Sequence, residues 1–428
     1  MSYPTASLTR TLRHTLNNGL TVLIYPTPDV PVVSVRGDLL VGAVHEPDEQ
    51  LAGLAVFTAA ALIRGTQRRS FQQITAEIEA RGCSASVNAG MHTTNFSGKA
   101  LPEDLPLVLE LLAELLRQPT FPPHELDKLR GQYLMSLRES EQDTRYRASQ
   151  ALRELLFPVA HPYRRFASGT AESLKQISRA DLVRFHQHYH PTSSTIVIVG
   201  AVEPEDVLRR LDQHFGDWQG TTPTPTLAPE LPPVPPLSAI RREDVVLSGK
   251  VQTDIYWAVP GLRRTDPDFY AALIGNMVLG QFGMGGRLWH AVRERQGMAY
   301  SVSSGLEAGF GAGPWLAYAG VNPHNVERAI AAVLAELALF VEQGCTLEEV
   351  DDVRAYLTGS LALGLETTGG IASTLLSIER FGLGLDYLDR YPALIHAVTL
   401  DEINAVARRY LTLDRYVLAT AGPPASAG

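Results

Sequence analysis

The sequence predicts an α+β fold made of two homologous domains, each with helices packed on a largely antiparallel sheet. Runs rich in β-branched residues at 32–36 and 194–199 are typical of strands. Apolar residues recur at helical spacing over 105–116 and 329–340. A hairpin turn is predicted at Asn17-Asn18-Gly19, between two apolar runs. Because strands come in groups followed by long helices, we expect helices to cover one face of each sheet.

A proline-rich segment divides the chain. Residues 221–237 read TTPTPTLAPELPPVPPL and contain seven prolines, which excludes a helix or a central strand there. We therefore predict an N-terminal domain at 1–220, a linker at 221–237 and a C-terminal domain at 238–428.

The two halves repeat one another. Three matches occur in the same order, which favours duplication over chance. They pair 76–87 with 291–302, LLAELL at 111–116 with VLAELAL at 333–339, and 125–137 with 349–361. In this register Gly82 falls on Gly297 and Arg130 falls on Arg354, so we expect each pair to occupy equivalent positions.

Composition and charge exclude several classes of function. Hydrophobic residues make up 45% and charged residues 19% of the 428, an ordinary balance for a globular protein. The formal net charge of -9 argues against a nucleic-acid or anionic-membrane partner, since such binding needs a basic face. No run approaches the ~18 apolar residues of a membrane span.

Two distant cysteines, Cys83 and Cys345, are too few for a disulfide framework or a cysteine-rich metal site. The N-terminus lacks a basic run followed by an apolar stretch, so no signal peptide is predicted. The expected location is the cytoplasm.

Several segments resemble the pitrilysin/insulinase-type metallopeptidases, the inverted zincins that carry an H-x-x-E-H motif. The resemblance covers nearly the whole chain and is most specific in its second half. The segments are 15–35, 42–57, 161–170, 189–206 and 252–304. The resemblance implies two homologous domains that face one another as half of a clam-shell chamber.

The zinc motif of that family is degenerate here. Active members have two histidines four residues apart on one helix face, with a glutamate base between them. Those positions fall on Val56 and Ala60 for the histidines and on Ala59 for the base. The distal glutamate ligand falls on Ser136. We therefore expect no metal and no cofactor in this chain.

A second feature of the family is retained. An arginine and a tyrosine seven residues apart, here Arg293 and Tyr300, reach the zinc site of active members from the other domain. Such groups stabilise the oxyanion that forms when a peptide carbonyl is attacked. Without the resemblance, the simpler interpretation is a surface ion pair of Arg293 with Glu294 or a nearby helix residue, and a core position for Tyr300 in a strand.

Three other motifs were weighed. The glycine-rich run 280–287 lacks the ending of a phosphate loop, and we expect Gly283, Gly285 and Gly286 to contact substrate instead. His186 and His190 could share a helix face, but no carboxylate lies between them, so a structural role is favoured. The charged residues of 138–147 are interpreted as a solvated helix face.

The resemblance is strongest to bacterial two-subunit members, in which one chain carries zinc and the other the Arg/Tyr pair. The predicted function is the zinc-less subunit of a heteromeric metallopeptidase acting on peptides. Its partner would be a homologue with H-x-x-E-H that holds the zinc, and the isolated chain could form a homodimer. The alternative is a structural scaffold, like the core proteins of respiratory complexes.

Overall fold

The computed structural model describes residues 8–220, 230–281 and 286–424. Contacts divide the chain into two compact units, which are interleaved along the sequence. Unit 1 comprises 1–137, 166–230 and 360–390, and unit 2 comprises 138–165, 231–359 and 391–428. The units therefore differ from the linear halves 1–220 and 238–428 by two exchanged segments.

Unit 1 is built on a six-stranded sheet with the order β1-β2-β6-β3-β5-β4, in which only β2 and β6 run parallel among neighbours. Its strands are β1 (Leu12–Thr15), β2 (Thr21–Pro26), β3 (Val33–Leu39), β4 (Ser84–Ala89), β5 (Thr94–Ala100) and β6 (Ser194–Gly200). Its helices are α1 (Leu54–Leu62), α2 (Phe71–Ala80), α3 (Leu105–Arg117), most of α4 (Pro123–Ser140), α6 (Ala171–Gln176), α7 (Arg179–His186), α8 (Pro204–Phe215) and α12 (Thr368–Arg380).

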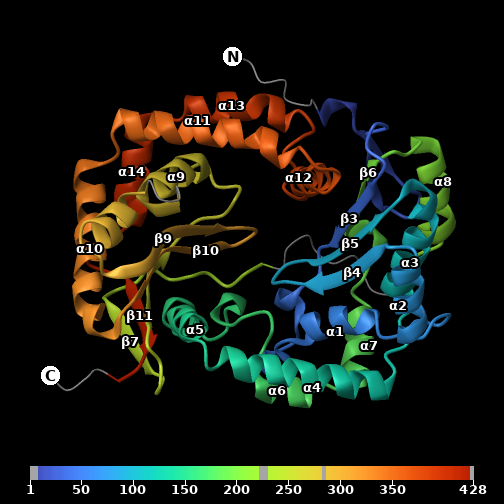
Figure 1. The fold of residues 1–428 in the computed structure, drawn as a ribbon, viewed down its shortest axis with the longest axis horizontal. Helices are drawn as coiled ribbons and strands as arrows, with labels where there is room; N and C mark the ends of the chain where they lie inside the picture. The colour runs from blue at the N-terminus through green and yellow to red at the C-terminus, as the bar shows by residue number, and fades with distance from the viewer. Residues whose placement is uncertain (1–7, 221–229, 282–285, 425–428) are drawn as a thin grey trace. The chain divides into compact units, whose positions relative to one another are not determined.

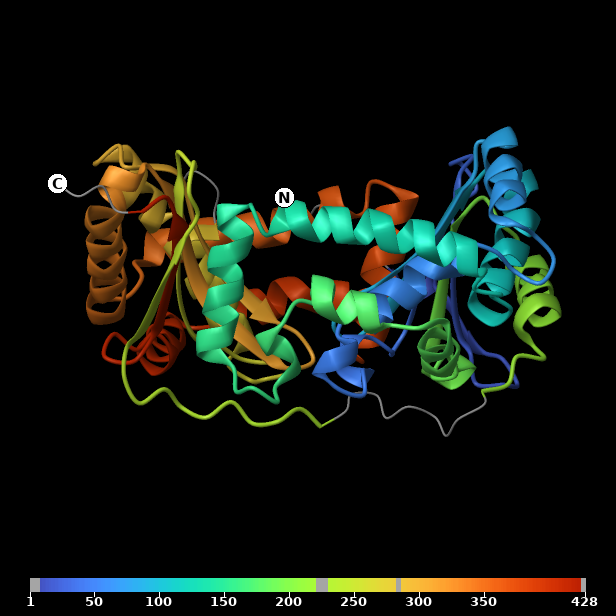
Figure 2. The same ribbon diagram turned by 90° about the horizontal axis from the view of Figure 1, so that it is seen from below.

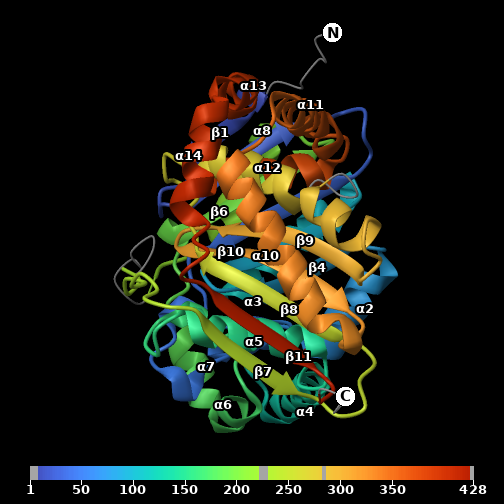
Figure 3. The same ribbon diagram turned by 90° about the vertical axis from the view of Figure 1, so that its left-hand side faces the viewer.

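Unit 2 is built on a five-stranded sheet with the order β7-β11-β8-β10-β9, in which only β7 and β11 run parallel among neighbours (Figure 3). Its strands are β7 (Arg241–Val246), β8 (Thr253–Pro260), β9 (Ala299–Ala308), β10 (Ala312–Val321) and β11 (Val417–Gly422). Its helices are α5 (Thr144–Leu156), α9 (Phe269–Asn276), α10 (Val326–Gln343), α14 (Leu400–Tyr410) and most of α11 (Leu347–Gly364) and α13 (Tyr387–Ala397).

Short helices complete both units. The π-helical segments are Met277–Gln281 and Trp289–Glu294, the latter called η9 below. The 3₁₀ turns are Leu8–Arg10, Ala43–His45, Glu49–Leu51, Pro102–Asp104, Pro162–Arg164, Pro191–Ser193 and Pro323–Asn325.

The strand order confirms the repeat. The series β2-β6-β3-β5-β4 has the same relative directions as β7-β11-β8-β10-β9, so each half contributes the same five strands. The predicted hairpin at 17–19 joins β1 to β2. Among the described strands of unit 2, none corresponds to β1. The expected strands and helices are present as β3, β6, α3 and α10. The α+β class with two related domains is therefore confirmed.

Gly82 and Gly297 occupy the same conformation in the two units. Each ends a helix just before an edge strand, with φ of +61° and +60° respectively. A side chain at a positive φ is strained, whereas glycine adopts this left-handed turn freely. Both halves of the chain therefore require a glycine at this left-handed turn.

Arg130 and Arg354 are also equivalent. The Nη2 of Arg130 donates to the carbonyl oxygen of Ile177 over 2.8 Å, and Nη2 of Arg354 donates to that of Val398. Each carbonyl directly precedes the N-cap of a helix, Ser178 of α7 and Thr399 of α14. Each arginine thus ties a long helix to the start of a later one.

One helix of each half is exchanged. Helix α5 comes from the first half but packs on β7, β8 and β11 of unit 2 (Figures 1 and 2). Helix α12 comes from the second half but packs on β3 and β6 of unit 1 (Figure 1). This exchange explains why the compact units differ from the linear halves.

The exchanged helices are anchored alike at their first residues. Thr144 of α5 donates from Oγ1 to the Asp254 carboxylate of β8 over 2.5 Å. Thr368 of α12 and Ser34 of β3 share a hydroxyl hydrogen bond of 2.8 Å. Both contacts join the start of the helix to the second residue of the equivalent strand. The Thr144 and Thr368 contacts are therefore counterparts.

Beyond these anchors the two helices differ. At the end of α12, Nε of Arg380 lies 2.6 Å from the Asp38 carboxylate of β3, whose side chain is only 3% exposed. Burial raises the pKa of the Asp38 carboxyl, and the guanidinium of Arg380 opposes that rise. On α5, Arg145 donates to the Tyr256 hydroxyl over 3.2 Å and lies over the Tyr318 ring. Arg145 stays exposed while it makes these contacts, in keeping with the solvated helix face expected over 138–147.

We predict that Arg380→Met lowers the free energy of unfolding by about 3–5 kcal/mol, because it leaves the buried Asp38 carboxylate without its counter-charge. Urea denaturation measures the change. The double variant Asp38→Asn/Arg380→Met should recover most of the loss. Arg13→Ala is the control, since the Arg13–Glu379 pair also reaches α12 but is far more exposed and contributes at most ~1 kcal/mol. Equal losses for Arg13→Ala and Arg380→Met would contradict the assignment.

Candidate functional site

The start of helix α1 is fixed by buried hydrogen bonds. One carboxylate oxygen of Glu46 accepts the backbone N–H groups of Gly53 and Ala55 over 3.1 and 3.0 Å. Gly53 has a φ of +92°, and a Cβ there would lie 2.7 Å from the Ser168 carbonyl oxygen. Ser173 donates its hydroxyl to the Ala52 carbonyl over 2.7 Å. The helix that carries the zinc motif in active family members is therefore well formed here.

The metal-ligand positions on α1 carry no donor atoms in their side chains. Val56 and Ala60 lie one turn apart on the same helix face and are half-buried, while Ala59 is fully buried. Ser136 is exposed on α4. Within the described residues, no group of three or more His, Cys, Asp or Glu side chains is placed to hold a metal ion. An alkyl helix face cannot bind zinc or activate water.

Helices α1 and α4 nevertheless lie in contact. The Phe57 ring of α1 meets the Tyr133 ring of α4 edge to face, with centroids 5.9 Å apart. The guanidinium of Arg130, one turn earlier on α4, lies 5.2 Å from the Phe57 centroid. Ser136 lies one turn beyond Tyr133, so the four degenerate positions belong to two neighbouring helices.

Arg293 and Tyr300 lie side by side in unit 2. Arg293 is on η9, Tyr300 is the second residue of β9, and the left-handed turn at Gly297 lies between them. The Nη1 of Arg293 donates to the backbone carbonyl of Tyr300 over 2.7 Å. Arg293 is exposed, and the Tyr300 side chain is 61% exposed. The structure thus joins the Arg293 guanidinium to the backbone of Tyr300 and leaves both residues exposed.

A tryptophan that sequence reasoning missed holds Arg293 from the other side. The Arg293 guanidinium lies 4.0 Å from the Trp289 ring centroid, within the range of a cation–π contact. Trp289 is four residues earlier on the same helix, so helical spacing could have identified it. The carbonyl of Tyr300 and the Trp289 ring together restrict the guanidinium.

The simpler interpretation of this pair is wrong on both counts. Glu294 is bonded to His290 by its carboxylate, and within the described ranges it makes no ion pair with Arg293. Tyr300 is not a core residue, given its exposure.

The glycine-rich run has a packing role at one of its predicted positions. Gly283 and Gly285 lie outside the described residues. Gly286 is buried, and a Cβ there would lie 2.7 Å from the Cα of Gly280. Two backbone segments therefore approach so closely that only glycine fits.

His186 and His190 have structural partners. His186 is buried, its Nε2 lies 2.8 Å from the Leu116 carbonyl oxygen, and burial lowers the pKa of its imidazole. The Nδ1 of His190 accepts the backbone N–H of Thr192 over 3.2 Å. The structural interpretation of this histidine tract is supported.

Within the described ranges, no single helix is both long and apolar enough to cross a membrane. The pair Pro323–Gln343 and Leu347–Gly364, bent by 101°, meets that criterion only when taken together, by length and composition.

Two family profiles match consecutive parts of the chain. The profile of "Insulinase (Peptidase family M16)" matches residues 21–161, and that of "Peptidase M16 inactive domain" matches 176–357. The chain belongs to the M16 peptidase family. The first match contains α1 with its degenerate motif, and the second contains Arg293 and Tyr300.

Individual M16 relatives match over most of their length. An uncharacterized zinc protease of Streptomyces coelicolor is 28% identical over 93% of this chain and 87% of its own. A non-peptidase homologue of Helicobacter pylori is 27% identical over 88% of both chains. The crystal structure of an M16 inactive domain from Pseudomonas fluorescens is 25% identical, with a TM-score of 0.87 over 96% of this chain and 98% of the other. The family resemblance inferred from the sequence is confirmed.

We predict that the purified chain retains no stoichiometric zinc after dialysis, measured by elemental analysis. Installing the missing donors as Val56→His, Ala59→Glu, Ala60→His and Ser136→Glu should give about one equivalent, because imidazoles four residues apart share a helix face. The double variant Val56→His/Ala60→His, without carboxylates, should bind more weakly. One tightly held zinc in the unmodified chain would overturn the assignment.

Proposed function

We propose that the chain is the zinc-less subunit of a heteromeric M16 metallopeptidase and that Arg293 and Tyr300 act in the active site of a zinc-bearing homologue. The observation that carries the proposal is the exposed pair on unit 2, held together in a chain whose α1 has no metal ligand.

The chemistry of the two side chains suits an oxyanion. A guanidinium has five N–H donors, and the Tyr300 carbonyl occupies Nη1 of Arg293. Within the described part of the chain, no hydrogen bond is recorded for the Tyr300 hydroxyl, which leaves it able to donate. Donors aimed at the developing negative charge stabilise the tetrahedral intermediate of peptide hydrolysis.

Helix α1 explains why a partner is required. A zinc peptidase needs a metal-activated water and a general base. Val56, Ala59 and Ala60 supply neither, so both must come from a homologue with an intact H-x-x-E-H. The name of the Helicobacter pylori relative, a non-peptidase homologue, is in keeping with a chain that is inactive alone.

Peptides or unfolded segments are the proposed substrate, and Gly283 and Gly285 are proposed to contact them, whereas Gly286 is buried against Gly280. The proposed location is the cytoplasm, and a homodimer is proposed for the chain in isolation. The rival function is a structural scaffold, in which Arg293 and Tyr300 have no role in turnover.

We predict that this chain alone does not cleave peptides and that adding the zinc-bearing homologue gives an active complex. In that complex, Arg293→Ala or Tyr300→Phe should lower kcat about a hundredfold to a thousandfold. The reason is that a hydrogen bond made only to the oxyanion acts on the transition state and not on substrate binding. Steady-state kinetics measure kcat and KM, and size-exclusion chromatography measures assembly.

Arg328→Ala is the matched control, because Arg328 is an exposed arginine on α10 away from the pair. It should leave kcat unchanged. If the Arg293 and Tyr300 variants assemble and turn over substrate like the unmodified complex, the scaffold function gains and the proposed one fails.

A further inference from the structure

A polar groove of about 490 Å³ lies in unit 2 between η9 and α10, and its lining does not include Arg293 or Tyr300. Its lining includes Arg287, His290 and Arg295 from the η9 region, and Glu336 and Leu339 from α10. None of these residues is used by the proposed catalytic function.

Glu336 is the unusual group in this groove. Its side chain is only 8% exposed, and Nη2 of Arg295 lies 4.0 Å from the carboxylate. Within the described residues, no hydrogen bond to the Glu336 carboxylate is recorded. A buried carboxylate without hydrogen bonds costs several kcal/mol unless a cation reaches it. Burial accordingly raises the pKa of the Glu336 carboxyl, although Arg287 and Arg295 oppose the rise.

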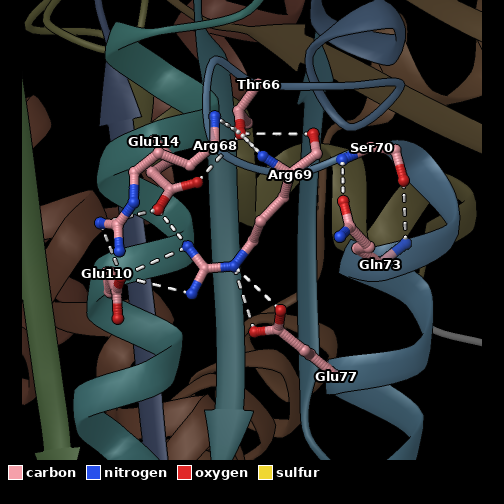
Figure 4. A network of polar contacts seen from close by, with 8 residues as sticks. All are labelled: Thr66, Arg68, Arg69, Ser70, Gln73, Glu77, Glu110 and Glu114. Atoms are coloured by element: carbon pink, nitrogen blue, oxygen red, sulfur yellow. Dashed lines mark hydrogen bonds and ion pairs between the residues drawn. The ribbon is translucent and has the colours of Figure 1, made fainter.

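The other half of the repeat shows what satisfies such a carboxylate. Glu114 is the counterpart of Glu336, since LLAELL at 111–116 matches VLAELAL at 333–339 and both glutamates are buried. Figure 4 shows Glu114 surrounded by donors from the loop that precedes α2. Thr66 donates its hydroxyl over 2.9 Å, Arg68 lies 3.2 Å away, and Arg69 makes a direct ion pair. Two guanidinium groups therefore neutralise Glu114.

Among the described residues, the arginines beside Glu336 do not replace that arrangement. Arg287 makes a two-point ion pair with Glu349, at 2.6 and 2.7 Å, and also donates to the Gly344 carbonyl. Arg295 is 69% exposed and only at the limit of ion-pair distance. Because Arg287 is already paired, the groove is poorly suited to an anion and has a carboxylate available for a cation.

We propose that this groove binds the arginine side chain of a peptide, with the guanidinium on Glu336 and the aliphatic stem along Leu339. Leu339 is 41% exposed and lies three residues after Glu336, so it presents an apolar surface next to the carboxylate. Arginine is chosen because guanidinium groups fill the equivalent place in unit 1 and pair with carboxylates at two points. The site belongs to the isolated chain and does not depend on the proposed peptidase partner.

The test measures binding of N-acetyl-Ala-Arg-Ala-amide to the full chain by calorimetry. The same peptide with citrulline, which keeps the shape but lacks the charge, should bind at least about tenfold more weakly. Glu336→Gln should weaken arginine-peptide binding by a similar or larger factor. Glu342→Gln should leave it unchanged, because Glu342 is an exposed acid on the same helix outside the groove lining.

A second variant tests the site in case Glu336→Gln does not fold. Leu339→Lys places an ammonium next to Glu336, so it should raise the unfolding temperature and block binding of the arginine peptide. Citrulline and arginine peptides that bind equally would overturn the proposal. Undiminished binding to Glu336→Gln would also overturn it, as would no binding of the arginine peptide or a preference for a glutamate peptide.

Discussion

Helices α5 and α12 each pack on the sheet formed mainly by the other half of the chain. A sheet in this fold has two faces that must be covered. In each unit one of those faces is covered by a helix from the other half of the chain. Neither half can therefore complete its core alone, and residues far apart in sequence must fold together. The Thr144–Asp254 and Ser34–Thr368 contacts fix where each exchanged helix begins.

Sequence reasoning found the elements and the repeat but not this exchange. Period and turn signals are local, so they identified the hairpin at 17–19 and the strands at 32–36 and 194–199. The repeat matches predicted that Gly82 corresponds to Gly297, and the equal φ values bear this out. An amphipathic helix, however, has the same pattern whichever sheet it covers, so nothing in α5 or α12 indicates the exchange.

The candidate site was predictable in part for similar reasons. The spacing of Arg293 and Tyr300 is visible in the sequence, and so is the loss of donors at Val56 and Ala60. The hydrogen bond from Arg293 to the Tyr300 carbonyl is not visible in the sequence, because it depends on how the chain turns at Gly297. That turn brings the end of η9 beside the start of β9, so the exposed pair follows from backbone geometry rather than from side-chain pairing.

The two halves differ most where side chains, and not the backbone, determine the local arrangement. Side chains that hydrogen-bond to the backbone are the same in both halves. Examples are the arginines that donate to the carbonyl oxygens of Ile177 and Val398. Side chains that interact with other side chains differ between the halves. Glu114 is neutralised by arginines of its own unit, whereas Glu336 faces a groove. A duplicated framework can lose metal ligands in one half and open a charged groove in the other without changing its strand order. New binding chemistry in this chain is therefore to be sought among such unequal pairs.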